Sequence, residues 1–498
     1  MGIRSVLSKP FAKYIVNQQN KWASRPVESQ ESIKTAIVKK ASETAFGKDH
    51  GFKDIKSYED FKRAVPVGDY EVIRPYVDRI KTGEPDVLWP GLPSYFAKTS
   101  GTTSGTKYIP ITRDSVPNHI NSARNALLNY VHNSGNSQFL DGNLIFLSGS
   151  PIMTKTSGIH TGRLSGIVNH HVPAYLRSNQ MPSFETNCIE DWEEKVDRIV
   201  EETCKKNMTL ISGIPPWVQM YFDKLTLKTG KPIKDIFPDF SLFVYGGVNF
   251  APYRAKLFES IGKTIDSVET YPASEGFIAY QDTLDQEGLL LLLDTGIFFE
   301  FIPADEYYNE HPTRLSIGEV KTGVNYALII NSNAGLWGYS IGDTIQFVST
   351  DPYRILVTGR IKHFISAFGE HVIGQEVEKA INHAVKEQDH TEITEFTVAP
   401  QVNPDSGLPR HQWFVEFGRP PENMEQFAST IDQKLRQLNS YYDDLISGNI
   451  LEQLEIVILK KNSFIDYMKS QGKLGGQNKV PRLSNDRKIA NVLIKNRE

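Results

Sequence analysis

Residues 99–106 combine six hydroxyl side chains with two glycines, and Lys107 follows directly. Glycines let main-chain N–H groups approach an anion, hydroxyl groups donate further hydrogen bonds, and the lysine adds a positive charge. The composition therefore predicts a phosphate-binding loop. The spacing is not that of Walker A, which needs four residues between its first glycine and its Gly-Lys pair. Taken alone, the composition also fits an ordinary polar surface loop.

Three further places carry side chains suited to a nucleotide. Tyr271 and Glu275 follow a predicted strand, where an aromatic ring can stack on a base and a carboxylate can hold Mg²⁺ near phosphates. Asp343 ends a glycine-bearing turn and can accept both hydroxyls of a ribose, and Arg360 can reach nucleotide hydroxyls or phosphates. Each place also has a plainer interpretation. Ser274 could cap a helix with Glu275 in its first turn. Asp343 could be a turn aspartate that bonds its own backbone, and Arg360 a solvated linker arginine.

Two patterns remain open on this basis. Lys479 lies in a glycine- and asparagine-rich loop of a basic tail, where most lysines are simply solvated. Residues 338–342 fit the hydrolase pattern G-x-S-x-G with Ser340 as the nucleophile, but that elbow needs a strand, a sharp turn and a helix. Here a strand-like run follows Ser340. An α/β-hydrolase is therefore the rival of a different class, and a non-catalytic binding protein is a third possibility.

Composition narrows the class of protein. The chain has 55 basic and 59 acidic residues, so no nucleic-acid partner is expected. Its two cysteines exclude a disulfide framework or a cysteine-rich metal site and suit a reducing, cytoplasmic location. No run approaches the ~18 consecutive apolar residues of a transmembrane helix, so no membrane partner is expected either. The sequence contains no H-E-x-x-H motif.

The elements that must position these residues indicate an α/β protein of two domains. Short apolar runs alternate with helical patterns between about residues 189 and 270, which favours a largely buried sheet. Between residues 289 and 357 short β-type runs follow one another, as in an antiparallel sheet or a small barrel. The pattern then resets into a small α+β domain. We place the boundary after residue 361, giving domains 1–361 and 362–498.

In order, these segments resemble the acyl-adenylate-forming superfamily, and more narrowly the auxin- and jasmonate-conjugating acyl acid amido synthetases of plants and their bacterial relatives. Residues 99–107 are similar to the family motif S-S-G-T-S-x-G-x-x-K, one residue shorter. Residues 271–275 match Y-x-x-S-E, and residues 335–343 resemble G-L-Y-R-Y-R-x-G-D. Gly338 and Ser340 replace the two arginines of that last motif. The resemblance spans about residues 60–485.

The resemblance implies a large N-terminal domain of mixed β-sheets with helices and a small β-barrel-like region, and a smaller, mobile C-terminal α+β domain rotating about residues 360–362. It implies ATP and Mg²⁺ as cofactors, with Glu275 as the metal ligand and Glu275 and Lys479 as catalytic residues. The implied ATP-binding residues are Thr99, Ser100, Gly101, Thr102, Thr103, Lys107, Gly246, Gly247, Tyr271, Ala273, Ser274, Asp343 and Arg360.

The implied reaction is a two-step ligation. A carboxylic acid attacks the α-phosphate of ATP to give an acyl-AMP and pyrophosphate, and an amine, expected to be an amino acid, then displaces AMP. An acyl-CoA ligase shares the first step and stays open as an alternative.

Overall fold

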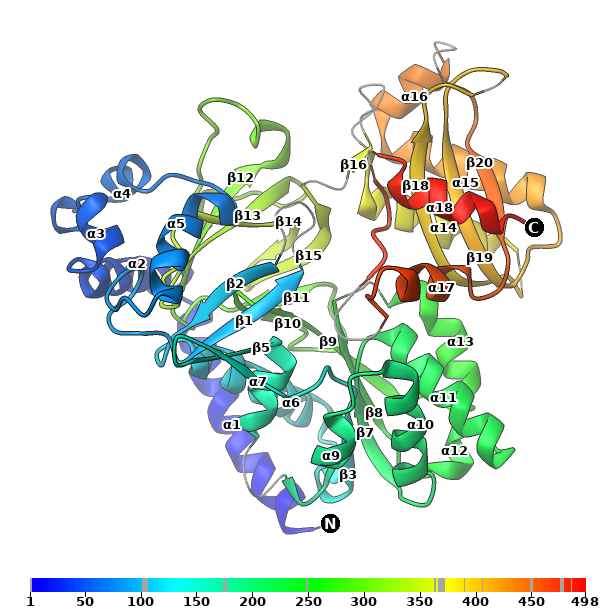
Figure 1. Cartoon of the computed structure of the whole chain (residues 1–498), viewed down its shortest axis with the longest axis horizontal. Helices are drawn as coiled ribbons and strands as arrows, with labels where there is room; N and C mark the ends of the chain where they lie inside the picture. The colour runs from blue at the N-terminus through cyan, green and yellow to red at the C-terminus, as the bar shows by residue number, and fades with distance from the viewer. Residues whose placement is uncertain are drawn as a thin grey trace. The chain divides into compact units, whose positions relative to one another are not determined.

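Figure 1 shows the computed structural model of the chain. It describes residues 2–100, 106–172, 177–247, 250–361, 364–365, 372–388, 390–404, 406–447, 451–474, 479–484 and 486–498.

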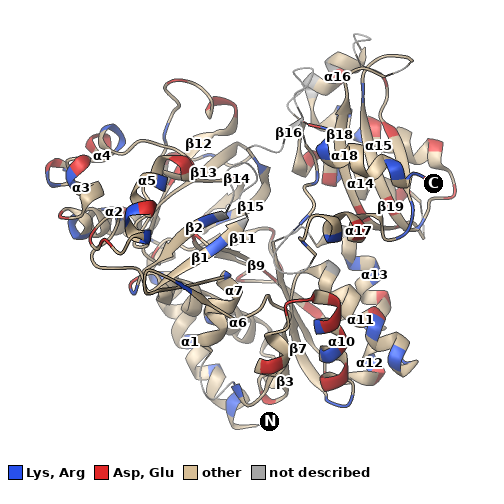
Figure 2. Cartoon of the chain, in the orientation of Figure 1, with Lys and Arg blue, Asp and Glu red and all other residues tan. Residues whose placement is uncertain are grey.

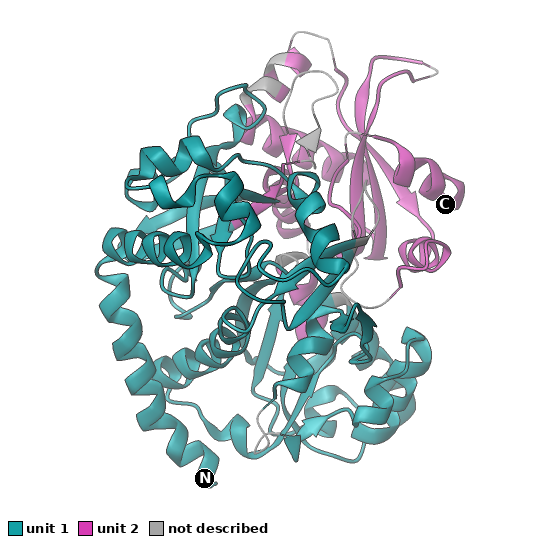
Figure 3. Ribbon diagram, turned by 60° about the vertical axis from the view of Figure 1, so that its left-hand side comes forward, with its two compact units in different colours: residues 1–248, 260–356 teal, residues 249–259, 357–498 magenta. Residues whose placement is uncertain are grey.

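The chain divides into two compact units (Figure 3). One comprises residues 1–248 and 260–356, and the other comprises residues 249–259 and 357–498. The division groups residues by their contacts and does not locate a hinge. The domain boundary that the sequence predicts after residue 361 therefore stays a prediction.

The helices of the first unit follow the expected amphipathic logic. In α5, for example, Asp69 Oδ1 accepts a hydrogen bond from the Glu71 amide, and the buried positions Tyr70, Ile73 and Val77 recur at a helical spacing. The described helices of this unit are α1 (Ile3–Ala23), α2 (Pro26–Ala41), α3 (Ala45–Asp49), α4 (Tyr58–Ala64), α5 (Tyr70–Lys81), α6 (Val116–Ser134), α7 (Leu164–His170), α9 (Phe184–Asn187), α10 (Trp192–Thr203), α11 (Pro215–Thr229) and α12 (Ile233–Ile236).

The strands of the first unit form two sheets. A four-stranded sheet has the order β2-β1-β5-β4, with β1 (Tyr95–Ser100), β2 (Thr106–Ile111), β4 (Thr154–Thr156) and β5 (Ile159–Gly162). An eleven-stranded sheet has the order β12-β13-β14-β15-β11-β10-β9-β8-β7-β3-β6. Its strands are β3 (Asn143–Phe146), β6 (Gln180–Met181), β7 (Met208–Ser212), β8 (Leu242–Gly246), β9 (Asp266–Ala273), β10 (Gly276–Tyr280), β11 (Leu289–Leu291), β12 (Ile297–Pro303), β13 (Asn325–Ser332), β14 (Tyr339–Thr350) and β15 (Tyr353–Arg360).

The large sheet has a parallel and an antiparallel half. Strands β9, β8, β7, β3 and β6 are parallel, and β7 is almost fully buried, as expected for a strand covered on both faces. The other half is antiparallel: β9 pairs with β10, β10 with β11, β11 with β15, β12 with β13, and β13 with β14. The α/β fold class predicted from the sequence is confirmed.

The barrel-like region implied by the resemblance is not found among the described residues. Strand β11 pairs with β15 on one side and with β10 on the other, so the antiparallel strands continue into the parallel half of the sheet. Strand β12 is an edge of the sheet and does not close on β11. For residues 289–357 the sequence left two interpretations open, an antiparallel sheet and a small barrel. The structure shows the antiparallel sheet.

The second unit is an α+β unit around a three-stranded sheet of order β18-β19-β20. Strand β18 pairs antiparallel with β19, and β19 pairs parallel with β20. Most of α13 (Ala251–Ile261) also belongs to this unit. The other elements are β16 (Phe364–Ile365), β17 (Val372–Ile373), α14 (Gly374–Glu387), β18 (Glu392–Gln401), β19 (Arg410–Arg419), α15 (Met424–Leu438), α16 (Ser440–Ser447), β20 (Glu455–Leu459), α17 (Ser463–Ser470) and α18 (Lys488–Leu493).

Candidate active site

The segment that carries Glu275 is a tight hairpin. Strands β9 and β10 pair antiparallel with Ala273 opposite Gly276, and Ser274 and Glu275 form the turn between them. The alternative in which Ser274 caps a helix is therefore wrong. The hairpin places Glu275 at the tip of two strands of the central sheet, where its position is fixed by the ladder on both sides.

Two tyrosine–carboxylate hydrogen bonds bring three predicted site residues together. Tyr271 Oη donates to Asp343 Oδ2 at 2.6 Å, and Tyr339 Oη donates to Glu275 Oε1 at 3.3 Å. Strands β9 and β14 are separated by β10, β11 and β15 in the sheet, so the sheet must curl for these bonds to form. Tyr271, Glu275 and Asp343, predicted from two separate motifs, thus lie at one place in the fold.

Asp343 owes its position to a β-bulge in β14. The pairing with β13 runs from Ser340 opposite Ile329 to Thr344 opposite Ala327, so three residues of β14 face one of β13. Within the bulge Gly342 has a φ of 82°, which favours glycine. Bulges re-aim side chains at sheet positions next to active sites. The glycine-bearing motif therefore acts as a bulge that directs Asp343.

The start of β14 is held by the segment before α5. The Gly68 amide donates to the Gly338 carbonyl at 3.0 Å, and the Ser340 amide donates to the Gly68 carbonyl at 2.8 Å. A Cβ atom on Gly338 would lie 2.1 Å from the Pro66 carbonyl oxygen, and the φ of Gly338 is 53°. The position where the family motif has its first arginine is thus filled by the neighbouring main chain.

Ser340 does not stand at a nucleophile elbow. It lies inside strand β14, it is buried, and its amide is engaged by Gly68. The elbow of an α/β-hydrolase presents its serine on a sharp turn between a strand and a helix. The geometry contradicts the hydrolase interpretation.

Burial controls the ionisation of Tyr339. Burial raises the pKa of Tyr339 far above its usual range, and the charge of Glu275 raises it further. The Tyr339 hydroxyl is therefore protonated at any physiological pH and donates to the carboxylate. One oxygen of Glu275 is held in this way, which fixes the orientation of the carboxyl group.

The predicted phosphate loop connects β1 and β2. Thr99 pairs with Lys107 and Ser100 pairs with Thr106 at the end of this hairpin. Gly101, Thr102 and Thr103 lie outside the described residues. The Tyr108 amide donates to Tyr70 Oη at 3.0 Å.

The residues predicted to line the base lie along β8 and β9. Gly246 ends β8 opposite Thr270, Gly247 follows with a φ of 82°, and Ala273 ends β9. Ligands of open α/β sheets bind outside the carboxyl ends of their parallel strands. Their placement is compatible with the predicted role, which stays a prediction.

Arg360 and Lys479 belong to the second unit, and both are exposed. Arg360 ends β15. Lys479 precedes a segment that runs beside β18: the Val398 amide donates to the Arg482 carbonyl at 2.9 Å, and the Ser484 amide donates to the Val398 carbonyl at 2.9 Å. Lys479 therefore extends from a firmly anchored segment, and its role toward ATP stays a prediction.

The side chain of Arg482 provides that anchor. This side chain is 12% exposed, its Nε donates to Glu378 Oε1 at 3.3 Å, and its other nitrogens contact Glu395 and Tyr253. Burial is the largest single influence on the pKa of Arg482 and acts to lower it. The charge of Glu395 acts in the opposite direction, and the pKa of Arg482 is raised well above its usual range.

Sequence reasoning missed His119, which lies close to the Glu275 turn. The neighbouring Asn118 accepts a hydrogen bond from the Phe277 amide at 2.7 Å and donates to its carbonyl at 3.1 Å. Burial lowers the pKa of His119 to about 4, and its Nδ1 has no hydrogen-bond partner among the described residues. The side chain lines a cavity of about 10 Å³ that His171 and six aliphatic residues also line. No sequence pattern around His119 marks it.

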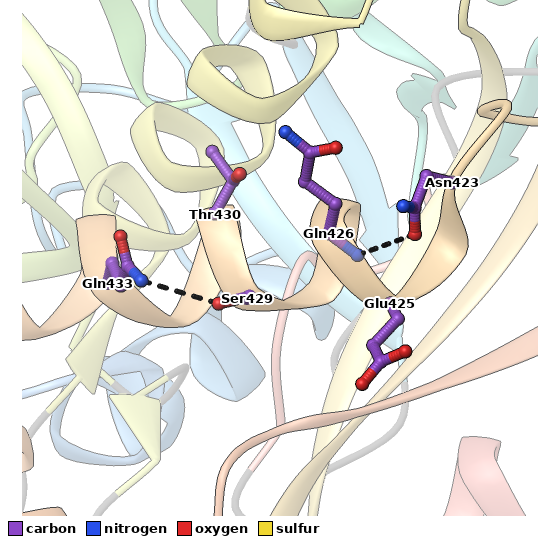
Figure 4. Close-up of a pocket in the computed structure, with 6 residues that line it drawn as sticks. All are labelled: Asn423, Glu425, Gln426, Ser429, Thr430 and Gln433. Atoms are coloured by element: carbon purple, nitrogen blue, oxygen red, sulfur yellow. Dashed lines mark hydrogen bonds between the residues drawn. The ribbon is translucent and has the colours of Figure 1, made fainter.

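A polar hollow on the second unit is not a competing site (Figure 4). Its lining comes from one stretch of α15 and its cap, and Asn423 Oδ1 there accepts from the Gln426 amide at 3.0 Å. The lining residues are Asn423, Glu425, Gln426, Ser429, Thr430 and Gln433. One carboxylate among neutral side chains offers no catalytic pair. No group of three or more histidine, cysteine, aspartate or glutamate side chains in the described part of the chain could hold a metal.

Comparison with solved structures places the fold. The acyl acid amido synthetase GH3.15 superimposes with a TM-score of 0.79 at 17% identity, covering 97% of this chain and 96% of that one. A 2-hydroxyisobutyryl-CoA ligase superimposes with a TM-score of 0.61 at 13% identity, covering 95% and 92%. The chain therefore has the fold of these ligases.

Comparison of sequences identifies the family. Residues 15–188 match the GH3 family N-terminal domain, residues 290–360 its central domain and residues 375–488 its C-terminal domain. The chain belongs to the GH3 family. Indole-3-acetic acid-amido synthetase GH3.3 of Arabidopsis thaliana is 23% identical over 91% of this chain and 88% of that protein. Jasmonoyl–L-amino acid synthetase JAR4 of Nicotiana attenuata is 20% identical over 91% and 90%.

Proposed function

We propose that this protein is an ATP-dependent acyl acid amido synthetase. In the first step a carboxylate oxygen of the acid bonds to the α-phosphorus of ATP, and pyrophosphate leaves. In the second step the nitrogen of an amino acid bonds to the acyl carbon, loses a proton, and AMP leaves with the bridging oxygen. Adenylation is needed because a free carboxylate has no acceptable leaving group.

One observation carries the proposal: two hydrogen bonds link the β9–β10 hairpin to β14, with Asp343 accepting from the Tyr271 hydroxyl and Glu275 accepting from the Tyr339 hydroxyl. Two carboxyl groups with oriented oxygens can serve two different parts of one nucleotide. Asp343 would accept the ribose hydroxyls, and Glu275 would bind Mg²⁺ at the phosphates. This arrangement fits a reaction in which positioning and charge neutralisation supply most of the rate.

Mg²⁺ fits the chemistry of this site. It is commonly bound through one or two carboxylates together with substrate phosphates, and Glu275 is a carboxylate with one oxygen oriented by Tyr339. When bound, Mg²⁺ would screen the phosphate charge from the attacking carboxylate.

The acceptor distinguishes this proposal from an acyl-CoA ligase, whose fold the chain also shares. Two relatives named as amido synthetases, one for indole-3-acetic acid and one for jasmonate, match over about nine-tenths of the chain. Their similarity supports an amine as the acceptor in this protein. The acid itself and the amino acid are not specified by any residue described above. A cytoplasmic location is proposed on the two free cysteines.

The test supplies purified protein with ATP, Mg²⁺ and a panel of carboxylic acids, and measures pyrophosphate release. Acids that give release are then supplied with either amino acids or coenzyme A, and the products are identified by mass spectrometry. An amide product supports the proposal. A thioester formed with coenzyme A, and no amide with any amino acid, would replace it with the acyl-CoA ligase.

A further inference from the structure

The N-terminal helix α1 is packed with its small polar side inward. Ser5, Ser8 and Ala12 are buried, whereas Ile3 and Leu7 are 79% and 64% exposed. A helix on the surface of a globular protein normally turns its apolar face toward the core. The orientation of α1 is the reverse of that rule, so its exposed apolar face needs an explanation.

The contacts of the buried face show that α1 cannot rotate to hide its apolar side. The hydroxyls of Ser5 and Ser137 are hydrogen-bonded at 2.6 Å, and Ser8 Oγ donates to the Ser5 carbonyl at 2.8 Å. Further along the helix, Gln19 Oε1 accepts from Asn129 at 2.9 Å and from Tyr280 at 2.8 Å. These buried polar groups would lose their partners if the helix turned.

The exposed side chains form one stripe. Ile3, Val6, Leu7, Phe11 and Tyr14 are between 41% and 79% exposed and follow one another at intervals of one, three or four residues. At 100° per residue these positions share one side of the helix, opposite Ser5, Ser8 and Ala12.

Basic residues border the stripe on both sides. At 100° per residue, Arg4 lies on one flank, and Lys9 and Lys13 lie on the other. Residues 3–23 include no aspartate or glutamate. In Figure 2 the ribbon of α1 carries blue basic positions and no red acidic ones, in line with the sequence. Arg124 of α6 adds a cation, with its guanidinium 5.3 Å from the ring centre of Phe11. Asp141 is a nearby acid, and it accepts hydrogen bonds from the Gly2 and Ser5 amides at the start of the helix.

We propose that α1 docks this protein onto a lipid surface that contains anionic headgroups. A helix with an apolar stripe and a cationic border lies in the membrane interface, with its apolar side chains among the acyl chains and its cations at the headgroups. A second copy of the chain is a poorer occupant, because two such helices would bring cation against cation. Within the described residues no helix is long and apolar enough to span a bilayer. The proposed contact is one at the membrane surface, and it departs from the expectation of no membrane partner, which considered only spanning segments.

The test uses the full chain and sedimentation with vesicles. Wild-type protein should sediment with vesicles of phosphatidylcholine and phosphatidylserine, much less with phosphatidylcholine alone, and less as salt is raised. Replacing Leu7→Glu together with Phe11→Glu should reduce binding at least tenfold. The matched control is Leu227→Glu on α11, where a leucine is 87% exposed outside the stripe. It should bind like the wild type.

Several outcomes would overturn the proposal. They are failure of the wild type to bind phosphatidylserine vesicles, equal binding to neutral vesicles, and equal loss in the Leu227→Glu control. Size-exclusion chromatography of the same proteins covers the second-copy alternative: a dimer that the double variant abolishes, without vesicle binding, would assign the stripe to self-association. Circular dichroism checks that all variants are folded. None of these readouts depends on the proposed ligase activity.

Discussion

The hydroxyls of Tyr271 and Tyr339 each donate a hydrogen bond to a carboxylate that the proposed chemistry requires. A carboxylate has room for several hydrogen bonds, so one tyrosine can orient it and leave acceptor positions for a ligand. Burial keeps the Tyr339 hydroxyl protonated, which makes it a dependable donor to Glu275. At this scale the candidate site is a pair of acids whose orientations are set by tyrosine hydroxyls, independently of any ligand.

Replacing Glu275→Gln removes one negative charge at nearly constant volume. If Glu275 binds Mg²⁺ at the phosphates, acid-dependent pyrophosphate release should fall by about 100-fold or more. The control is Tyr339→Phe, which keeps the carboxylate and loses only its orienting hydrogen bond, and should cost much less. Full activity in Glu275→Gln would leave Glu275 as a turn residue without a catalytic role.

The buried side chain of His119 should make the stability of the folded protein depend on pH in the acid range. Its pKa is about 4 in the folded protein, below the ordinary value of 6.5 that applies when the chain is unfolded. The unfolded state therefore binds a proton first as pH falls. The stability that the neutral side chain contributes is present above pH 6.5, is lost between pH 6.5 and 4, and amounts to about 3 kcal/mol.

Thermal unfolding of wild-type protein and His119→Gln across that pH range tests this statement. The variant should lose less stability than the wild type between pH 6.5 and 4. His132→Gln changes an exposed histidine of the same helix and should follow the wild type. Parallel pH profiles for wild type and His119→Gln would contradict the assignment.

The sequence predicts Tyr271, Glu275 and Asp343 because each stands in a motif of fixed spacing. It does not predict Tyr339 or His119. The contact of Tyr339 with Glu275 depends on how the sheet curls, and the burial of His119 on α6 depends on the packing of β2 and α7 against that helix. Neither property is local in the chain, so residue type and spacing carry no sign of it.

At the scale of elements, the β9–β10 hairpin and the bulge of β14 decide where the acids point. The sequence favours a strand close to the observed β9, yet Ser274 and Glu275 read equally well as the start of a helix. The turn lacks the asparagine and glycine that usually mark a two-residue hairpin. The observed pairing of β9 with β10 resolves the ambiguity. Strand β10 is held in turn by β11, and no local sequence pattern contains that pairing.

Gly338 and Gly342 make a matched pair for testing the bulge. Both have positive φ, but a Cβ on Gly338 would meet the Pro66 carbonyl at 2.1 Å, whereas open space surrounds Gly342. Gly342→Ala should cost about 1–2 kcal/mol for its backbone alone. Gly338→Ala should cost roughly 2 kcal/mol more, because it adds a clash. Urea unfolding midpoints measure the difference, and equal midpoints would contradict this account.

At the scale of the whole molecule, the sequence predicts a change of character near residue 361 and two domains of unequal size. It does not predict that residues 249–259 group with the C-terminal unit. Their membership rests on contacts such as Tyr253 with Glu395, 142 positions apart. In the sequence α13 lies between β8 and β9, so the pattern alone assigns it to the unit that contains these strands. Long-range contacts override that assignment.

Lys479 tests the role proposed for the second unit. If its charge neutralises the α-phosphate as pyrophosphate leaves, Lys479→Ala should slow acyl-AMP formation while ATP affinity is kept. The second step, started from synthetic acyl-AMP, should be much less affected if the small domain then turns Lys479 away. Lys473→Ala, an exposed lysine of the same tail, is the control. Equal damage to both steps would refute the proposed domain rotation.

The most direct test of the ligase account follows one oxygen atom. An acid that supports pyrophosphate release is labelled with ¹⁸O in its carboxylate and converted with ATP, Mg²⁺ and an amino acid. Attack of the carboxylate on the α-phosphate transfers one labelled oxygen to AMP when the amide forms. The account predicts AMP with one ¹⁸O atom and an amide that keeps the other. Label in inorganic phosphate with formation of ADP, or an amide without labelled AMP, would contradict adenylation as the first step.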